Sequence, residues 1–267
     1  MRPEPVPAPR PVRPVRHLVP ASLPPLLCLL ALWQALSASG VVPGYMLPGP
    51  LRVLAALWKD RLLLAGHLGR TLAEAAAGLG IAVAVAFILA VLMDLNRRIK
   101  EALGPLLLLT QTVPTVALAP LLILWMGYGS APKIALVFLT CFFPLTLALL
   151  GAFSAAGEDE LRLLKSMGAG SAQLYRYIKV PSSAAAFFSG LRVSASYSII
   201  GAVISEWLGG DAGLGVYMIR VRKSYSFDKM FAAILVVALL SLALMKLVGL
   251  VEKAAAPWRK DSQGSAG

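Results

Sequence analysis

The chain has 267 residues, of which 58% are hydrophobic and only 14% charged, and its mean hydropathy is +0.76. Soluble domains usually have apolar residues near half and charged residues near a quarter, so this composition predicts an integral membrane protein. The net charge of +12 would favour nucleic acid in a soluble domain, but membrane proteins accumulate Lys and Arg in cytoplasmic loops, so we expect no nucleic-acid partner. Cys28 and Cys141 both lie in apolar runs, which excludes a disulfide scaffold and predicts small core residues.

The N-terminal residues 1–21 are rich in proline and arginine, which predicts a disordered cytoplasmic tail. An alternative is a signal peptide, because arginine-rich, apolar and small-residue parts ending at Ser37, Ala38 and Ser39 follow in order. The apolar run is longer than a usual signal-peptide core. We therefore assign 22–66 to a first transmembrane helix and an outer loop.

The chain contains apolar runs long enough for six spans, because a hydrocarbon core of about 30 Å needs roughly 20 helical residues. The runs are 22–42, 68–93, 105–126, 132–153, 184–208 and 230–251. An all-α integral membrane protein with six transmembrane helices has both termini on one side. More Lys and Arg lie on that side, so we predict cytoplasmic termini and a C-terminal cytoplasmic tail at 252–267.

Pro114 and Pro120 lie inside the third run, which is therefore expected to kink, because proline frees a backbone carbonyl. Freed carbonyls are tolerated at membrane depth only against protein or a water-lined cavity. The run is therefore either a bent packing helix or, since it carries Gln111, Thr112 and Pro114, part of a translocation pathway. In the second run, Gly78 and Gly80 are expected to permit close helix packing.

Glu206, near the outer end of the fifth run, is the most suggestive ionisable residue, because a charge at the bilayer centre costs about 2.5–3.5 kcal/mol. It either forms an interfacial pair with Arg220 or Arg222, or lines the pathway together with Ser205. We expect His67, at a span boundary, to be interfacial. Neither histidine of the chain has a Cys or acidic cluster at ligand spacing, so we expect no metal and no cofactor.

A polar segment, 154–183, separates the fourth and fifth runs and is longer than a connector needs to be. Acidic residues followed by apolar residues at helical spacing predict two short helices about a turn, the second ending at Pro181. The turn is expected at Gly168, Ala169 and Gly170, where Gly168 allows a positive φ. An amphipathic loop lying on lipid headgroups is the alternative.

The spacing in this segment resembles a known signature. Gly168, nine residues, Ile178, two residues and Pro181 are similar to the cytoplasmic loop of permease subunits of bacterial ATP-binding-cassette (ABC) importers, with the pattern Glu-Ala-Ala, three residues, Gly, nine residues, Ile, one residue, Leu-Pro. The run 162–164 stands at the Glu-Ala-Ala positions and Val180 at the Leu position. The resemblance implies a coupling helix seated in a cleft of the ATPase subunit, with contacts from Leu164, Gly168, Ala169, Gly170, Tyr177, Ile178 and Pro181.

The resemblance covers 67–251 as a permease core and is nearest to importers of sulfonates, taurine, nitrate and thiamine pyrimidine precursors. It rests on His67-Leu-Gly-Arg-Thr71-Leu, Gln111-Thr-Val-Pro114-Thr-Val-Ala-Leu-Ala-Pro120, Ile123-Leu-Trp-Met-Gly127-Tyr, Phe143-Pro144 and Ile200-Gly-Ala-Val-Ile-Ser-Glu206-Trp-Leu-Gly. Gly213-Leu-Gly215-Val-Tyr-Met and Phe227-Asp-Lys-Met-Phe-Ala look most like hydroxymethylpyrimidine-type permeases.

The resemblance implies a homodimeric pore in the bacterial inner membrane, cytoplasmic ABC ATPase subunits and an outer solute-binding protein. The chain has no Gly-x-x-x-x-Gly-Lys-Ser/Thr motif, so ATP is expected to be handled by that partner, and we expect no catalytic residue here. The alternative is a secondary transporter or membrane-embedded enzyme. Such proteins carry ionisable groups in mid-span, of which we recognise only Lys246 near a cytoplasmic end.

Overall fold

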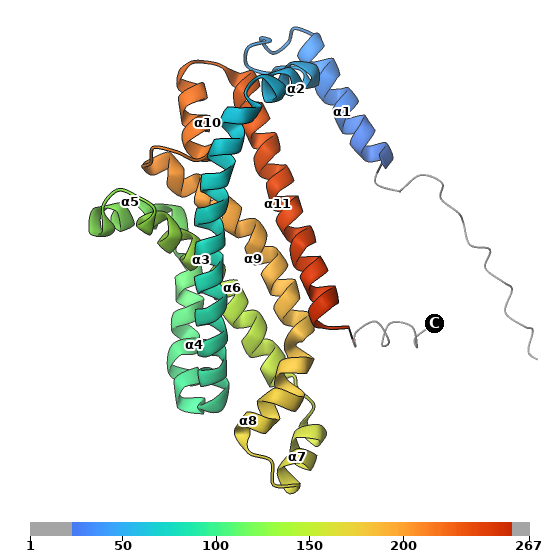
Figure 1. Cartoon of the computed structure of the whole chain (residues 1–267), viewed down its shortest axis with the longest axis vertical. Helices are drawn as coiled ribbons and strands as arrows, with labels where there is room; N and C mark the ends of the chain where they lie inside the picture. Colours follow the sequence, from blue (N-terminus) through green and yellow to red (C-terminus); the bar gives the residue numbers. More distant parts are fainter. Residues whose placement is uncertain (1–22, 258–267) are drawn as a thin grey trace, which may run out of the picture.

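The computed structural model describes residues 23–257, so the predicted tail 1–21 and most of the predicted tail 252–267 lie outside the described residues. Within this range every regular element is helical, which confirms the all-α prediction (Figure 1). The elements are α1 (Leu23–Ala38), α2 (Pro50–Lys59), α3 (Arg61–Leu95), α4 (Arg97–Thr112), α5 (Thr115–Met126), α6 (Ala131–Ser154), α7 (Glu158–Ser166), α8 (Ser171–Leu174), the π-helical turn η1 (Tyr175–Lys179), α9 (Val180–Leu208), α10 (Leu214–Lys223) and α11 (Phe227–Ala255).

The predicted count of six spans is supported only in part. By length and composition, four helical stretches between residues 23 and 257 can cross a membrane: Arg61–Leu95, Ala131–Ser154, Ser171–Leu208 and Phe227–Ala255. The α4 and α5 pair passes the same test together but is bent by 98°. Helix α1 is apolar but has only 16 residues, fewer than the roughly 20 that a span requires.

The bend between α4 and α5 confirms the expected proline kink and makes it a complete break. Pro114 cannot donate a backbone hydrogen bond, and it restricts Val113 before it to an extended conformation, observed at φ −82° and ψ 120°. Helix α4 therefore ends at Thr112, and α5 turns sideways out of the bundle (Figure 1). The third predicted span is two helices rather than one bent helix.

Small residues let α3 approach α6 closely. Ala82 and Ala86 are fully buried on the α3 face that meets α6. A Cβ on Gly78 would lie 2.6 Å from the side chain of Val137, whereas one on Gly80 would meet open space. The packing role predicted for the two glycines is confirmed for Gly78 and wrong for Gly80. Such contacts matter in lipid, where helices associate by close packing rather than by the hydrophobic effect.

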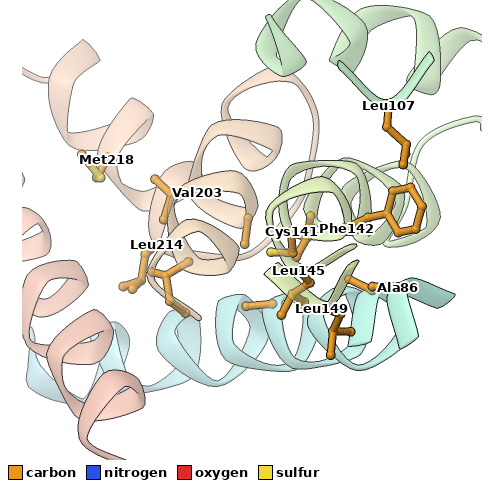
Figure 2. Packing of buried hydrophobic residues seen from close by; sticks show 14 of the residues in the cluster. Ala86, Leu107, Cys141, Phe142, Leu145, Leu149, Val203, Leu214 and Met218 are labelled. Carbon is orange, nitrogen blue, oxygen red and sulfur yellow. The ribbon is translucent and has the colours of Figure 1, made fainter. Parts of the chain in front are cut away.

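Helix α6 forms the centre of the core, between α3 and α9 (Figure 2). Leu145 and Leu149 are at most 1% exposed, and Figure 2 shows them between α6 and α3. Cys141 is also fully buried, as predicted, and its Sγ contacts the Ser194 carbonyl oxygen of α9 at 3.2 Å. Cys28 is exposed, so the expectation of a core residue there is wrong, because α1 stands apart from the bundle (Figure 1).

The two ends of the bundle carry different short helices. Helices α2 and α10 lie at one end, and α7 and α8 project beyond the other (Figure 1). The sequence patterns predicted α7 and α8 but neither α2 nor α10, which fall in regions expected to be loops. The distinction matters because each end carries a separate group of functional candidates.

Candidate functional site

The coupling segment, 154–183, contains the turn that the sequence predicted. Gly168 has φ +84°, a conformation that costs glycine little and other residues more. Its N–H donates to the Lys165 carbonyl at 3.0 Å, and the N–H of Ala169 donates to the Leu164 carbonyl at 3.0 Å. These bonds satisfy the last carbonyls of α7 and turn the chain sharply toward α8.

The second half of the segment differs from its prediction. Leu174 and Ile178 are buried, although the resemblance implied that Ile178 contacts the ATPase, whereas Tyr177 is 63% exposed. Pro181 was expected to end the helix, and this is wrong because the helical path continues from Ser171 to Leu208. The π-helical turn before it shifts the hydrogen-bonding pattern, so Pro181 falls in the first turn of α9, where a missing N–H is tolerated.

The base of the coupling segment is fixed to the bundle while its outer edge is exposed. Asp94 at the end of α3 accepts a hydrogen bond from the Tyr175 hydroxyl and forms an ion pair with Lys179. On the far side, Leu163 and Met167 are 60% and 76% exposed. The sequence analysis missed Asp94 and Lys179, whose pairing spans residues distant in the chain. The arrangement presents apolar side chains on a fixed base, which suits docking into a partner's groove.

At the opposite end, buried side chains bind the N-terminus of α10. Three successive backbone N–H groups, 213–215, donate to His67 Nδ1 at 3.0 Å, Thr71 Oγ1 at 2.8 Å and Glu206 Oε2 at 2.6 Å, in that order. The Thr71 hydroxyl also donates to Glu206 Oε1 at 2.7 Å. These bonds satisfy the N–H groups that a helix start leaves free, and they join α3, α9 and α10.

This arrangement corrects two predictions. Glu206 is 2% exposed and bonds Thr71 and the α10 backbone, rather than pairing with Arg220 or Arg222 at an interface. Arg220 instead donates to the Asp211 carbonyl at 2.7 Å. His67 is 7% exposed and is therefore buried rather than interfacial. Both errors have one cause: α10, which was not predicted, folds back over the ends of α3 and α9.

A buried ion pair lies one turn farther along α3. Lys133 Nζ is 3.1 Å from Glu74 Oε1, and both side chains are at most 5% exposed. Ser130 donates to the same oxygen at 3.1 Å, and Arg70 Nε lies 3.7 Å from it. The expectation that ionisable groups are nearly absent from the spans is wrong, because Glu74 lies inside the second predicted run and Lys133 lies at the start of the fourth. We call His67, Thr71, Glu74, Lys133 and Glu206 the polar cluster.

The pathway candidates divide into two groups that the single chain does not bring onto one surface. Gln111, Thr112 and Pro114 are exposed at the break between α4 and α5. Ser205 and Glu206 are buried in α9, where the Ser205 hydroxyl donates to its own helix backbone at 2.7 Å. Among residues 23–257, no group of His, Cys, Asp or Glu side chains is placed to hold a metal ion.

A third ion pair joins the short helices to the bundle near α2. Asp60, between α2 and α3, accepts hydrogen bonds from Lys229 Nζ and from the Tyr217 hydroxyl, each at 2.8 Å. The hydrogen bond from Lys229 is the largest influence on the Asp60 carboxyl and lowers its pKa below the ordinary value of 3.8. Burial raises the pKa of Tyr217, so this hydroxyl stays protonated and remains a donor.

With this geometry established, comparison with known proteins decides the family. Residues 78–257 match the sequence model of the family described as binding-protein-dependent transport system inner membrane component. The chain belongs to this family. The permease is 34% identical over 235 residues to the formylaminopyrimidine transport permease protein ThiX of Halalkalibacterium halodurans, covering 88% of this chain and 94% of that protein. It is 37% identical over 225 residues to a probable ABC transporter permease protein of Haemophilus influenzae, covering 83% and 92%.

A solved structure, described as an amino acid ABC transporter with histidines, shares the fold. Its TM-score is 0.55 at 18% sequence identity, and the match covers 75% of the permease and 97% of that chain. The predicted family is therefore confirmed: the permease is a multi-pass membrane subunit of an ABC importer, and ATP hydrolysis belongs to a separate subunit. Membership of this family implies an ATPase and a solute-binding protein as partners.

Proposed function

We propose that this permease imports a thiamine pyrimidine precursor. The observation that carries the proposal is the pattern of identity among relatives. The permease is 34% identical to the formylaminopyrimidine permease and 32% identical to a riboflavin transport permease of Chloroflexus aurantiacus, but 26% and 25% identical to permeases named for aliphatic sulfonates and taurine. Of these four relatives, which are named for a substrate, the two of higher identity are named for nitrogen heterocycles. A sulfonate, taurine or nitrate is the second candidate.

Transport would be driven through the coupling segment. In this proposal, the exposed edge at Leu163 and Met167 enters the cleft of a cytoplasmic ATPase, with Leu164, 168–170, Tyr177, Ile178 and Pro181 forming or supporting the contact surface. The fixed base at Asp94 and Lys179 would transmit movement of the ATPases to α3 and α9. Inverting a gate from 1:99 to 99:1 takes about 5.5 kcal/mol, which nucleotide binding can supply.

The proposed orientation places the coupling segment and both termini in the cytoplasm of a bacterial cell with an inner membrane. Helix α11 runs from the α10 end toward the α7 end, and α1 begins on the α7 side of α2 (Figure 1). Both ends of the described chain thus point away from α2 and α10. This agrees with the positive-inside bias of the sequence.

We assign a homodimeric pore because of the exposed polar groups at the break. Gln111 and Thr112 are exposed in the single chain although they lie at a break within an apolar helix pair. Facing lipid, the Gln111 carboxamide and the freed backbone carbonyls would be costly. A second copy would enclose them, and the enclosed space between the two copies would form the pathway.

The proposed function is tested by reconstitution. Permease, cognate ATPase and binding protein in proteoliposomes should take up tritiated formylaminopyrimidine only with ATP, and unlabelled taurine, nitrate or aliphatic sulfonate should not compete. Competition by one of these anions would transfer the assignment to the second candidate. Uptake by the permease alone, driven by a proton gradient, would instead identify a secondary transporter.

A further inference from the structure

The break between α4 and α5 leaves a cavity of about 230 Å³, which we call the break cavity. Gln111 of α4, Thr140 and Phe143 of α6, and Tyr197 of α9 are among the residues that line it. It is smaller than the roughly 300–1,000 Å³ of sites for drug-sized ligands. Its size suits a single substituted ring.

The break cavity has no charged lining. Its lining residues include no Lys, Arg, His, Asp or Glu. A sulfonate or nitrate entering it would lose hydration without gaining a counter-charge, which is strongly unfavourable. By contrast, Arg52, Lys59 and Lys229 line a cavity of about 420 Å³ near α2. The break cavity therefore selects an uncharged ligand.

Its polar groups include hydrogen-bond acceptors that lack a helical donor. Pro114 has no N–H to donate to the Thr110 carbonyl, and Pro144 has none for the Thr140 carbonyl, so two prolines leave carbonyls without their usual helical donors beside one cavity. The Gln111 side chain adds a carboxamide that can accept and donate. Carbonyl acceptors of this kind suit a ligand that carries amino groups.

Two aromatic rings supply the remaining recognition. Phe143 and Tyr197 come from different helices, α6 and α9, and both line the cavity. Aromatic side chains bind flat heterocycles through their faces and edges. Tyr197 is 44% exposed, so its ring is reachable from the open side of the cavity.

We propose that the break cavity is a transient binding site for an uncharged, single-ring, amino-substituted heterocycle crossing the membrane. The ring contacts Phe143 and Tyr197, and its amino groups donate to Gln111 and to the carbonyls of Thr110 and Thr140. This inference rests on the proposed function and adds the residues of this chain that recognise its substrate. It also gives the permease a selectivity of its own, against anions.

The test uses the complete transporter in proteoliposomes with tritiated formylaminopyrimidine. Gln111→Leu and Tyr197→Leu should each lower the maximal uptake rate about three- to tenfold, the effect of losing one or two hydrogen bonds or a ring contact. The half-saturating concentration should stay unchanged because the binding protein sets it. Matched controls are Gln34→Leu on α1 and Tyr128→Leu after α5, which are exposed residues outside the cavity and should transport within twofold of the unmodified rate.

A charge-reversal pair provides the second arm. Gln111→Glu keeps acceptor oxygens at the cavity and Gln111→Arg offers only donors, so uptake should be lower for arginine than for glutamate at equal membrane level. Equal uptake rates for the glutamate and arginine variants would overturn the proposed binding role of the break cavity, and so would leucine variants that transport as fast as their controls. In either case, formylaminopyrimidine uptake by the unmodified transporter would still support the proposed function. If the unmodified transporter imports taurine and not the pyrimidine, the proposed function and this inference both fail.

Discussion

The polar cluster and the coupling segment are opposite solutions to placing polar residues in a membrane protein. In the polar cluster, Glu74, Lys133 and Glu206 are almost fully buried and hold α3, α6, α9 and α10 together. In the coupling segment, the Glu158–Arg162 pair is 80% and 74% exposed, and apolar side chains face outward. The comparison teaches that the first region belongs to the fold of one chain, whereas the second presents an exposed apolar edge, which we propose is covered by the ATPase.

Removing one member of the buried Glu74–Lys133 ion pair is the strongest test of this difference between the two regions. Lys133→Met leaves the buried Glu74 carboxylate with only the Ser130 hydroxyl and the exposed Arg70 beside it, so we expect a loss of up to about 3–5 kcal/mol in unfolding free energy. Thermal unfolding of the detergent-purified permease measures it. Arg162→Met removes an exposed cation from the coupling segment and should change stability by about 1 kcal/mol or less. Similar losses for the two variants would show that burial does not separate the regions.

Glu206→Gln distinguishes a structural role from a pathway role. The glutamine amide can accept from only one of the two donors, Thr71 and the Gly215 N–H, and it opposes the other, so we expect a loss of about 1–3 kcal/mol. Thermal unfolding and ATP-driven uptake are measured on the same preparation. Reduced uptake with unchanged unfolding temperature would contradict the structural account and return Glu206 to the pathway.

Gly168→Val tests whether the turn of the coupling segment is needed for ATPase docking, and it should lower stability less than the two substitutions above. Valine at φ +84° introduces strain of order 1 kcal/mol, confined to the turn. The permease should still insert, while co-purification of the ATPase falls. The matched control is Gly151→Val in α6, outside the coupling segment, where φ is not positive and no atom lies within 4 Å of an added Cβ. If both variants retain the ATPase equally, the turn conformation is not needed for docking.

The smallest predicted effect concerns acid stability near α2. Because the pKa of Asp60 is lowered in the folded chain, its contribution is present above its ordinary value of 3.8 and is lost as pH falls through the folded value. Between pH 7 and 3, the free energy of unfolding should fall more for the unmodified permease than for Asp60→Asn, by about 1 kcal/mol or less. If the free energy of unfolding changes equally with pH in the two proteins, the Asp60–Lys229 pair does not contribute to stability.

The sequence predicted the features that depend on local pattern. Apolar runs predicted the long helices, Pro114 predicted the kink, and Gly168 predicted a turn with positive φ, which the structure confirms. Each is decided by residues within one or two turns. The coupling and pathway assignments remain predictions, since the structure contains a single chain.

The polar cluster could not be read from the sequence because its contacts join distant segments. Gly213 and His67 are 146 residues apart, and Glu74 and Lys133 are 59 apart. Neither pairing has a local signal. Glu74 within the second span was nevertheless visible, since a buried acid in an apolar helix requires a partner. A search for a compensating cation at the outer ends of the other predicted spans would have led to Lys133.

The most direct measurement of the central claim is the sidedness of the two ends. In a Cys28→Ser background, which removes the exposed native thiol, single cysteines Ser171→Cys in the coupling segment and Ala212→Cys before α10 are labelled with an impermeant maleimide. Inside-out vesicles should label only Ser171→Cys, and whole cells or right-side-out vesicles only Ala212→Cys. The reverse pattern would contradict the account, because a coupling segment outside the cell could not meet a cytoplasmic ATPase.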